Sequence, residues 1–324
     1  MPDPGRTTDP SNLVVGPAGS SAAVAAEAEA HDADYEVSLA PLSQWQLAWR
    51  RFRRHRLALV GAVIVGTMAF LAVFGPIIWP YDALELNRVS RAGGDPPGPQ
   101  AIFGTDSLGR SVFELVVNGA RLSVAVGFVT MAISTVIGVT AGALSGYFGG
   151  LTETILMRLV DLMLAVPFLF IILVAARFFG SGDPLVLMII FGVLSWPGLA
   201  RLVRALFLSL REQEYVMAAR AVGVGHSRII SRHILPNAIG PIVVSATLLV
   251  ANAIILEAFV SFLNFGIRDS DISWGTALSR SQGVLIQGNW WWAFFPGMAI
   301  ALTVIGINFL GDGLRDALDP RARA

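Results

Sequence analysis

The chain has 324 residues, of which 54% are hydrophobic and only 14% charged, and its mean hydropathy of +0.65 is too high for a soluble domain of this length. It is therefore predicted to be an integral membrane protein, and its formal net charge of zero gives no reason to expect a nucleic-acid partner. Because it contains neither cysteine nor lysine, it can form no disulfide, no cysteine metal site and no P-loop, so any ATP that drives it must be bound by another polypeptide.

The first 56 residues fall into two parts. Residues 1–42 are rich in Ala, Gly, Pro, Ser and acidic residues and lack apolar periodicity, which predicts a disordered cytoplasmic tail. Residues 43–56 interleave aromatic side chains with arginines, which is typical of a basic amphipathic segment that rests on the membrane surface.

Residues 57–80 are predicted to form the first transmembrane helix, because their apolar run is long enough to cross a hydrocarbon core of about 30 Å. The preceding pair Arg50-Arg51 would also suit a twin-arginine export signal. Against that alternative, the run is long for a signal sequence, no cleavage site follows it, and further apolar runs come later.

Residues 81–111 are polar and rich in Gly and Pro, which predicts an extracytoplasmic loop. Ser111 and Glu114 have the spacing of a capping box, so a helix is expected to begin near Val112.

Residues 112–324 are predicted to be the core domain, with five more transmembrane helices at about residues 122–144, 159–179, 185–206, 238–262 and 291–310. In the second span, Gly138, Gly142 and Gly146 recur at intervals of four residues, which predicts a face that packs closely against another helix. Pro167 is expected to kink the third span.

Three consecutive tryptophans, Trp290 to Trp292, are predicted to lie at a membrane interface, where indole rings prefer to sit. If the N-terminus lies inside, the inner segments hold most of the arginines and the outer loops hold few. This positive-inside bias predicts six spans with both termini in the cytoplasm.

Residues 212–237 form a basic, polar island between the fourth and fifth spans, and we call this segment the elbow. Four of its apolar residues have helical spacing and predict one narrow apolar stripe along a short helix, while two charged residues lie on its other faces: Tyr215, Ala218, Ala219 and Val222, with Glu214 and Arg220. Gly223 and Gly225 are expected to end that helix in a left-handed turn, and a second short helix is expected to stop at Pro236.

The amino-acid sequence of the elbow resembles the signature of a known protein family. Ala218-Ala219, Gly223 and Leu235-Pro236 have the spacing of the loop by which ABC importer permeases dock on their ATPase, although Met217 replaces a usual Glu and His233 a usual Ile. Three further blocks, at residues 104–123, 273–275 and 308–321, resemble the dipeptide/oligopeptide branch of that family, with Ser111 in place of a usual Asp. The resemblance extends from about residue 45 to the end.

This resemblance implies the type I ABC importer permease fold, all-α with six transmembrane helices, in the bacterial inner membrane. It implies a subunit that forms half of a path for di- or oligopeptides, with no catalytic residue, metal or cofactor of its own. The implied partners are a homologous second permease, two ATPase domains that bind ATP and Mg²⁺, and an extracytoplasmic solute-binding protein. The same branch also imports metal chelates, glutathione and haem, and these remain alternatives.

The residues that the resemblance makes candidates for ATPase docking are Tyr215, Ala218, Ala219, Val222 and Gly223, with Glu214 and Arg220 setting the register through charge. Glu257, deep in the fifth span, is expected either to contact the translocation path or to join helices by hydrogen bonds. In the third span, Asp161 is expected to pair with Arg158.

Two other classes of protein fit the sequence less well. The four histidines have no His-Glu-x-x-His spacing and no Gly-x-Ser-x-Gly motif is present, which argues against a metalloprotease or a serine hydrolase. A self-contained secondary transporter would be expected to show several intramembrane acids or an inverted repeat, whereas one deep carboxyl group and no persuasive repeat are found.

Overall fold

The computed structural model describes residues 44–80, 94–99, 101–106, 109–179, 182–268 and 271–318. The fold discussed below is that of the compact unit that begins at Leu47. The predicted tail of residues 1–42 lies outside the described residues, as does part of the predicted loop of residues 81–111. The regular elements of the described part are all helices, which confirms the all-α prediction.

The basic segment contains the short helix α2 (Gln44–Phe52). After it, five helical segments within the described ranges are long and apolar enough to cross a membrane. These are α3 (Arg56–Ile78), α4 (Val112–Phe148), the pair α7 and α8 (Pro184–Leu194 and Pro197–Leu210), the continuous helix His226–Phe262, and α13 (Trp291–Leu318). A sixth crossing needs α5 (Gly150–Ala165) and α6 (Phe168–Phe179) together. Each of the six predicted spans therefore coincides with a helix or a pair of helices.

The third span is interrupted at Pro167, where a kink was expected. The interruption is sharper than a kink, because α5 and α6 meet at 89°. Val166 adopts an extended conformation (φ −89°, ψ 135°), as the residue before a proline prefers to do, and this ends α5.

Helix α4 begins at Val112, as predicted, with Ser111 as its N-cap: the Ser111 hydroxyl accepts a hydrogen bond from the Glu114 N–H (3.4 Å). The helix has 37 residues, so it extends beyond the predicted span of residues 122–144 at both ends.

The glycine face of α4 packs against α8, and this confirms the predicted packing role. A Cβ atom at Gly142 would lie 2.6 Å from the Ala200 carbonyl oxygen, and one at Gly146 would lie 2.6 Å from the Phe207 Cβ. Only glycine therefore allows the two backbones to approach this closely.

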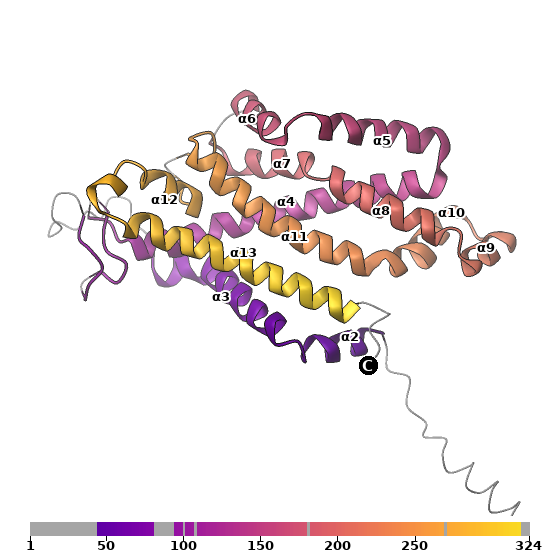
Figure 1. The fold of residues 1–324 in the computed structure, drawn as a ribbon, viewed down its shortest axis with the longest axis horizontal. Coiled ribbons are helices and arrows are strands. Elements are labelled where there is room, and N and C mark those ends of the chain that lie inside the picture. Colours follow the sequence, from indigo (N-terminus) through magenta and orange to yellow (C-terminus); the bar gives the residue numbers. More distant parts are fainter. Residues whose placement is uncertain are drawn as a thin grey trace, which may run out of the picture. The chain divides into compact units, whose positions relative to one another are not determined.

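A second close approach joins α3 to α13, which run side by side in Figure 1. A Cβ atom at Gly61 in α3 would lie 2.5 Å from the Gly306 carbonyl oxygen in α13. The elbow and helix α12 (Trp274–Arg280) lie at opposite ends of the long helices (Figure 1).

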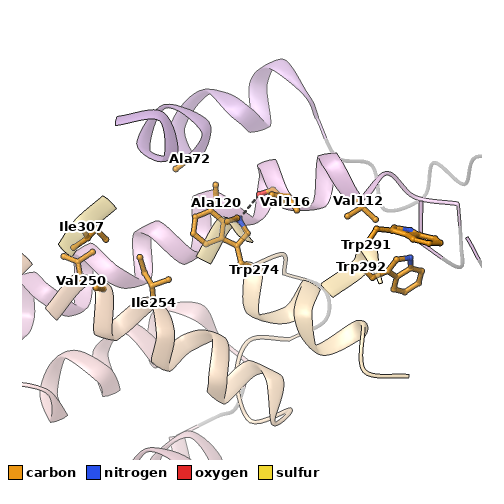
Figure 2. Packing of buried hydrophobic residues seen from close by; sticks show 12 residues of the cluster. Ala72, Val112, Val116, Ala120, Val250, Ile254, Trp274, Trp291, Trp292 and Ile307 are labelled. Atoms are coloured by element: carbon orange, nitrogen blue, oxygen red, sulfur yellow. Dashed lines mark hydrogen bonds between the residues drawn. The ribbon is translucent and has the colours of Figure 1, made fainter. Parts of the chain in front are cut away.

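The segment between the fifth and sixth spans contains regular structure of its own. It contains α12 and a short 3₁₀ turn (η2, Leu285–Gln287), and the Trp274 side chain is almost fully buried. The Trp274 indole N–H donates a hydrogen bond to the Val116 carbonyl oxygen of α4 (2.8 Å), as Figure 2 shows. The buried ring and its hydrogen bond hold α12 against α4. The sequence did not indicate that this tryptophan is buried.

Two of the three consecutive tryptophan rings are held inside the protein. Trp291 and Trp292 are buried, and both indole N–H groups donate to the Thr105 carbonyl oxygen (3.1 and 2.9 Å). Only Trp290 of the three is exposed. This carbonyl group belongs to the loop before α4, and it satisfies both indole donors inside the protein.

Candidate functional site: the elbow

The first helix of the elbow, α9 (Glu214–Ala221), ends in a Schellman motif. The Gly223 N–H donates to the Arg220 carbonyl oxygen (3.1 Å) and the Val224 N–H to the Ala219 carbonyl oxygen (3.1 Å). Gly223 has φ +79°, which confirms the predicted left-handed turn. Because glycine has no side chain, it adopts this conformation without strain. Gly225, with φ −65°, does not take part in that turn, so the prediction was wrong for this residue.

The second helix does not stop at Pro236, which corrects another expectation. The short α10 (His226–Arg228) continues through a π-helical stretch, η1 (Ile229–Ile234), into α11 (Leu235–Phe262). In this wider turn the Leu235 N–H donates to the Ile230 carbonyl oxygen. In an α-helix the ring of a proline clashes with the carbonyl group four residues earlier. Because the π-helical turn before Pro236 is wider than an α-helical turn, the helix can continue through this residue.

One side of the elbow is packed against the transmembrane helices. Val216 of α9 and Ile229 and Ile234 of η1 are fully buried. They belong to one apolar cluster with residues of α4, α8 and α11, among them Ala143, Tyr147, Val203, Phe207 and Ala238. The elbow is therefore held by apolar contacts to three of the long helices.

The opposite side of α9 is exposed and apolar. Tyr215 is 41% exposed, Met217 49% and Val222 79%, and Ala218 is exposed as well. Three residues of the predicted stripe, Tyr215, Ala218 and Val222, lie on this exposed side. Ala219 is buried on the inner side, one position away from the exposed Ala218, because Val216 and Ala219 form the stripe that packs inward.

Polar contacts also tie the elbow to the end of α4. The Tyr147 hydroxyl and His226 Nδ1 are hydrogen bonded at 2.7 Å, and the Arg211 Nη1 donates to the Gly146 carbonyl oxygen (3.0 Å). The Arg220 guanidinium lies over the Tyr147 ring, 5.6 Å from its centroid. The contact of Tyr147 with the elbow was not predicted from the sequence, because the sequence of one transmembrane helix does not indicate which loop the end of that helix will contact.

The two charged residues of the stripe prediction, Glu214 and Arg220, are both exposed. Neither is part of an ion pair with another described residue, whereas the neighbouring Arg211 pairs with Glu212 (2.9 Å). Glu214 therefore has no charged partner among the described residues, while the Arg220 guanidinium is held over the Tyr147 ring.

Glu257 lies away from the elbow, in α11, with a side chain that is 1% exposed. Its carboxylate accepts hydrogen bonds from three serine hydroxyls: Ser273 (2.7 Å), Ser261 (2.9 Å) and Ser123 (3.2 Å). Because Ser123 belongs to α4 and Ser273 caps α12, Glu257 joins three helices. These contacts support the helix-joining alternative.

A charged groove lies between α5 and α8. Asp161 pairs with Arg201 (2.6 Å), and Glu153 pairs with Arg204. The expected Arg158–Asp161 pair is therefore wrong, because an arginine from the packed helix α8 reaches the carboxylate instead.

Among the described residues, no three His, Cys, Asp or Glu side chains are grouped so that they could hold a metal ion.

Comparisons with known proteins agree with this architecture. The family model described as binding-protein-dependent transport system inner membrane component matches residues 138–324. A second model, described as the N-terminal TM domain of oligopeptide transport permease C, matches residues 43–92.

Several curated proteins are similar over most of their length. The dipeptide transport system permease protein DppC of Bacillus subtilis is 38% identical, over 87% of this chain and 87% of its own. The oligopeptide transport system permease protein OppC of the same organism is 39% identical, over 92% and 96%. A putative peptide permease protein of Brucella suis is 43% identical, over 84% and 89%.

Among solved structures, an inward-facing conformation of the MetNI methionine ABC transporter is similar, with a TM-score of 0.52 at 20% identity. The match covers 63% of this chain and 96% of the other, and it confirms the type I ABC importer permease fold. The chain therefore belongs to the family of inner-membrane components of binding-protein-dependent transport systems: it is a multi-pass permease subunit of an ABC importer, whose ATPase is a separate subunit.

Proposed function

We propose that the exposed side of α9 docks on an ATPase subunit and carries its movement into the transmembrane helices. The observation that carries this proposal is the two-sided burial of α9. Tyr215, Ala218 and Val222 form an exposed apolar stripe, while Val216 on the other side is fully buried against the long helices. A force applied to the exposed stripe would therefore reach α4, α8 and α11 together.

The remaining residues of the prediction have distinct roles in this proposal. Gly223 ends α9 and sets its angle to the following helix, and Ala219 supports the helix from the buried side. Glu214 and Arg220 would fix the register of docking through charge. The docked state can transmit work only if its free energy differs between states of the ATPase.

We further propose a complete importer of five parts: this chain, a homologous second permease, two ATPase domains that bind ATP and Mg²⁺, and an extracytoplasmic solute-binding protein. Both termini and the elbow would lie in the cytoplasm, since the inner segments carry most of the arginines.

The proposed substrates are di- or oligopeptides, because the names of the similar permeases above refer to dipeptide, oligopeptide or peptide transport. Uptake of labelled peptides and of nickel chelates by the reconstituted importer would separate these classes. Uptake of the chelate alone would refute the peptide assignment, and uptake by this chain alone under an ion gradient would indicate a secondary transporter.

The docking proposal is tested by Ala218→Arg and Gly223→Pro. Ala218 is exposed, so arginine can be placed there without disturbing the core, whereas proline cannot adopt the positive φ of Gly223. Both variants are expected to insert in the membrane and to lose substrate-stimulated ATP hydrolysis in the assembled importer. Wild-type stimulation in both variants would refute the assignment of α9.

A further inference from the structure

A cavity of about 530 Å³ lies between the two interrupted spans and the middle of α11. Met163 and Phe168 line it at the break between α5 and α6, Ser195 and Gly198 at the break between α7 and α8, and Asn252 and Phe259 on α11. Both breaks therefore open to the same space. Its size falls within the range of about 300–1,000 Å³ that is usual for small-molecule sites.

The lining of this cavity is apolar apart from two side chains, Ser195 and Asn252. Within the part of the chain that the structure describes, neither side chain forms a hydrogen bond. The Asn252 side chain is exposed to the open side of the cavity, so its amide is free to hydrogen-bond a polar group that enters there.

Part of this cavity is unfilled because Gly198 has no side chain. This glycine lies in the first turn of α8, which begins without a side-chain cap, and a Cβ atom there would have no described heavy atom within 4 Å. Unlike Gly142, which close packing requires, Gly198 therefore has no steric reason within this chain to be a glycine. A larger residue at position 198 would extend into the open space that the lining residues border.

We propose that this cavity binds one large apolar side chain of the transported peptide, with the Asn252 amide hydrogen-bonded to the adjacent peptide group. Apolar walls suit the side chain, and an amide that both donates and accepts matches the peptide group. The proposal rests on the proposed peptide function and adds to it a specificity that resides in the permease. The rival occupant is a side chain of the second permease subunit.

The first test fills the cavity with Gly198→Leu in the complete importer, reconstituted in vesicles with its unmodified binding protein. Uptake is measured for dialanine and for a dipeptide with a phenylalanine side chain. Uptake of the phenylalanine peptide is expected to fall at least about tenfold relative to dialanine, since a pocket discriminates about tenfold or more when the fit of a side chain is lost.

The matched control is Gly66→Leu in α3, which is also a glycine within a transmembrane helix and also has no described heavy atom within 4 Å of a Cβ. It lies outside the cavity lining, so it should change the uptake of neither peptide.

The second test addresses Asn252. Asn252→Leu is expected to lower the uptake of both peptides about fivefold, because the hydrogen bond to the peptide group is lost, and Asn252→Gln should restore part of it. An unchanged uptake in Asn252→Leu would overturn the proposed hydrogen bond even if Gly198→Leu behaves as expected.

Three results would overturn the cavity proposal. Gly198→Leu could reduce the uptake of both peptides equally, or it could change the uptake of neither. It could also prevent assembly with the second permease, which would assign the cavity to the subunit interface. In all three cases wild-type uptake of peptides persists, so the proposed function stands. If the wild-type importer takes up neither peptide, both proposals fail.

Discussion

The Tyr147 hydroxyl at the end of α4 and the His226 ring at the start of α10 are hydrogen bonded at 2.7 Å, and the Tyr147 side chain is buried. The same turn of α4 accepts a hydrogen bond from Arg211 at the Gly146 carbonyl oxygen. Helix α4 is thus attached directly to the elbow, although α8 and α11 are the helices that the elbow connects in sequence. The second span, and not only the fourth and fifth, should follow the movement of the elbow.

Tyr147→Phe should weaken this attachment without removing the ring from the apolar cluster. Loss of one hydrogen bond of about 1 kcal/mol corresponds to a change of about fivefold, and we expect substrate-stimulated ATP hydrolysis to fall by that factor. Basal hydrolysis by the ATPase should not change.

His226→Ala provides the control for that prediction, since it removes the other partner of the same bond. The double variant should be no worse than either single variant, because the two side chains act as a pair. Strictly additive effects would show that the two residues act independently of each other.

Glu257→Leu should destabilise the protein more than Glu257→Gln. Leucine leaves the hydroxyls of Ser123, Ser261 and Ser273 without their acceptor, at a cost of about 3 kcal/mol or more, whereas glutamine keeps one acceptor oxygen and should cost about 1 kcal/mol. Thermal unfolding in detergent micelles measures the difference.

The two interpretations of Glu257 are separated by uptake. If it joins helices, Glu257→Gln should transport nearly as well as the wild type. A glutamine variant with wild-type stability and no uptake would instead favour a role in the translocation path.

Gly142→Ala and Gly66→Ala should change stability in opposite directions. A Cβ at Gly142 would lie 2.6 Å from a backbone oxygen of α8, so alanine there should cost about 1–3 kcal/mol. At Gly66 the space is open, and alanine should stabilise the helix by up to about 1 kcal/mol because glycine is a poor helix former. Thermal unfolding of both variants checks the signs, and equal effects would contradict the packing of α4 on α8.

The proposed orientation can be tested by labelling, since the chain has no cysteine of its own. Arg54 is exposed at the end near α2, and Ile286 is 94% exposed in η2 at the other end of α13. In right-side-out vesicles, an impermeant maleimide should label Ile286→Cys at once and Arg54→Cys only after permeabilisation. The reverse pattern would place the elbow outside the cell and exclude docking on an internal ATPase.

The sequence by itself determined the features that depend on short stretches of chain. Long apolar runs identified the spans, Ser111 identified the start of α4, and the spacing of Gly138, Gly142 and Gly146 identified a packing face. Such features are local, because a bilayer demands about 20 apolar residues and a helix end demands a cap whatever lies beside them.

The tertiary structure alone decided which partner each side chain meets. Two sets of apolar residues in the elbow have helical spacing: Tyr215, Ala218 and Val222 form one set, and Val216 and Ala219 form the other. Only the packing of α9 against the cluster on α4 and α8 shows that the second set faces inward. Asp161 likewise bonds Arg201 from another helix and not the nearby Arg158. Periodicity fixes the angle between residues on one helix but not the rotation of that helix against its neighbours, which is set by contacts between residues far apart in the chain.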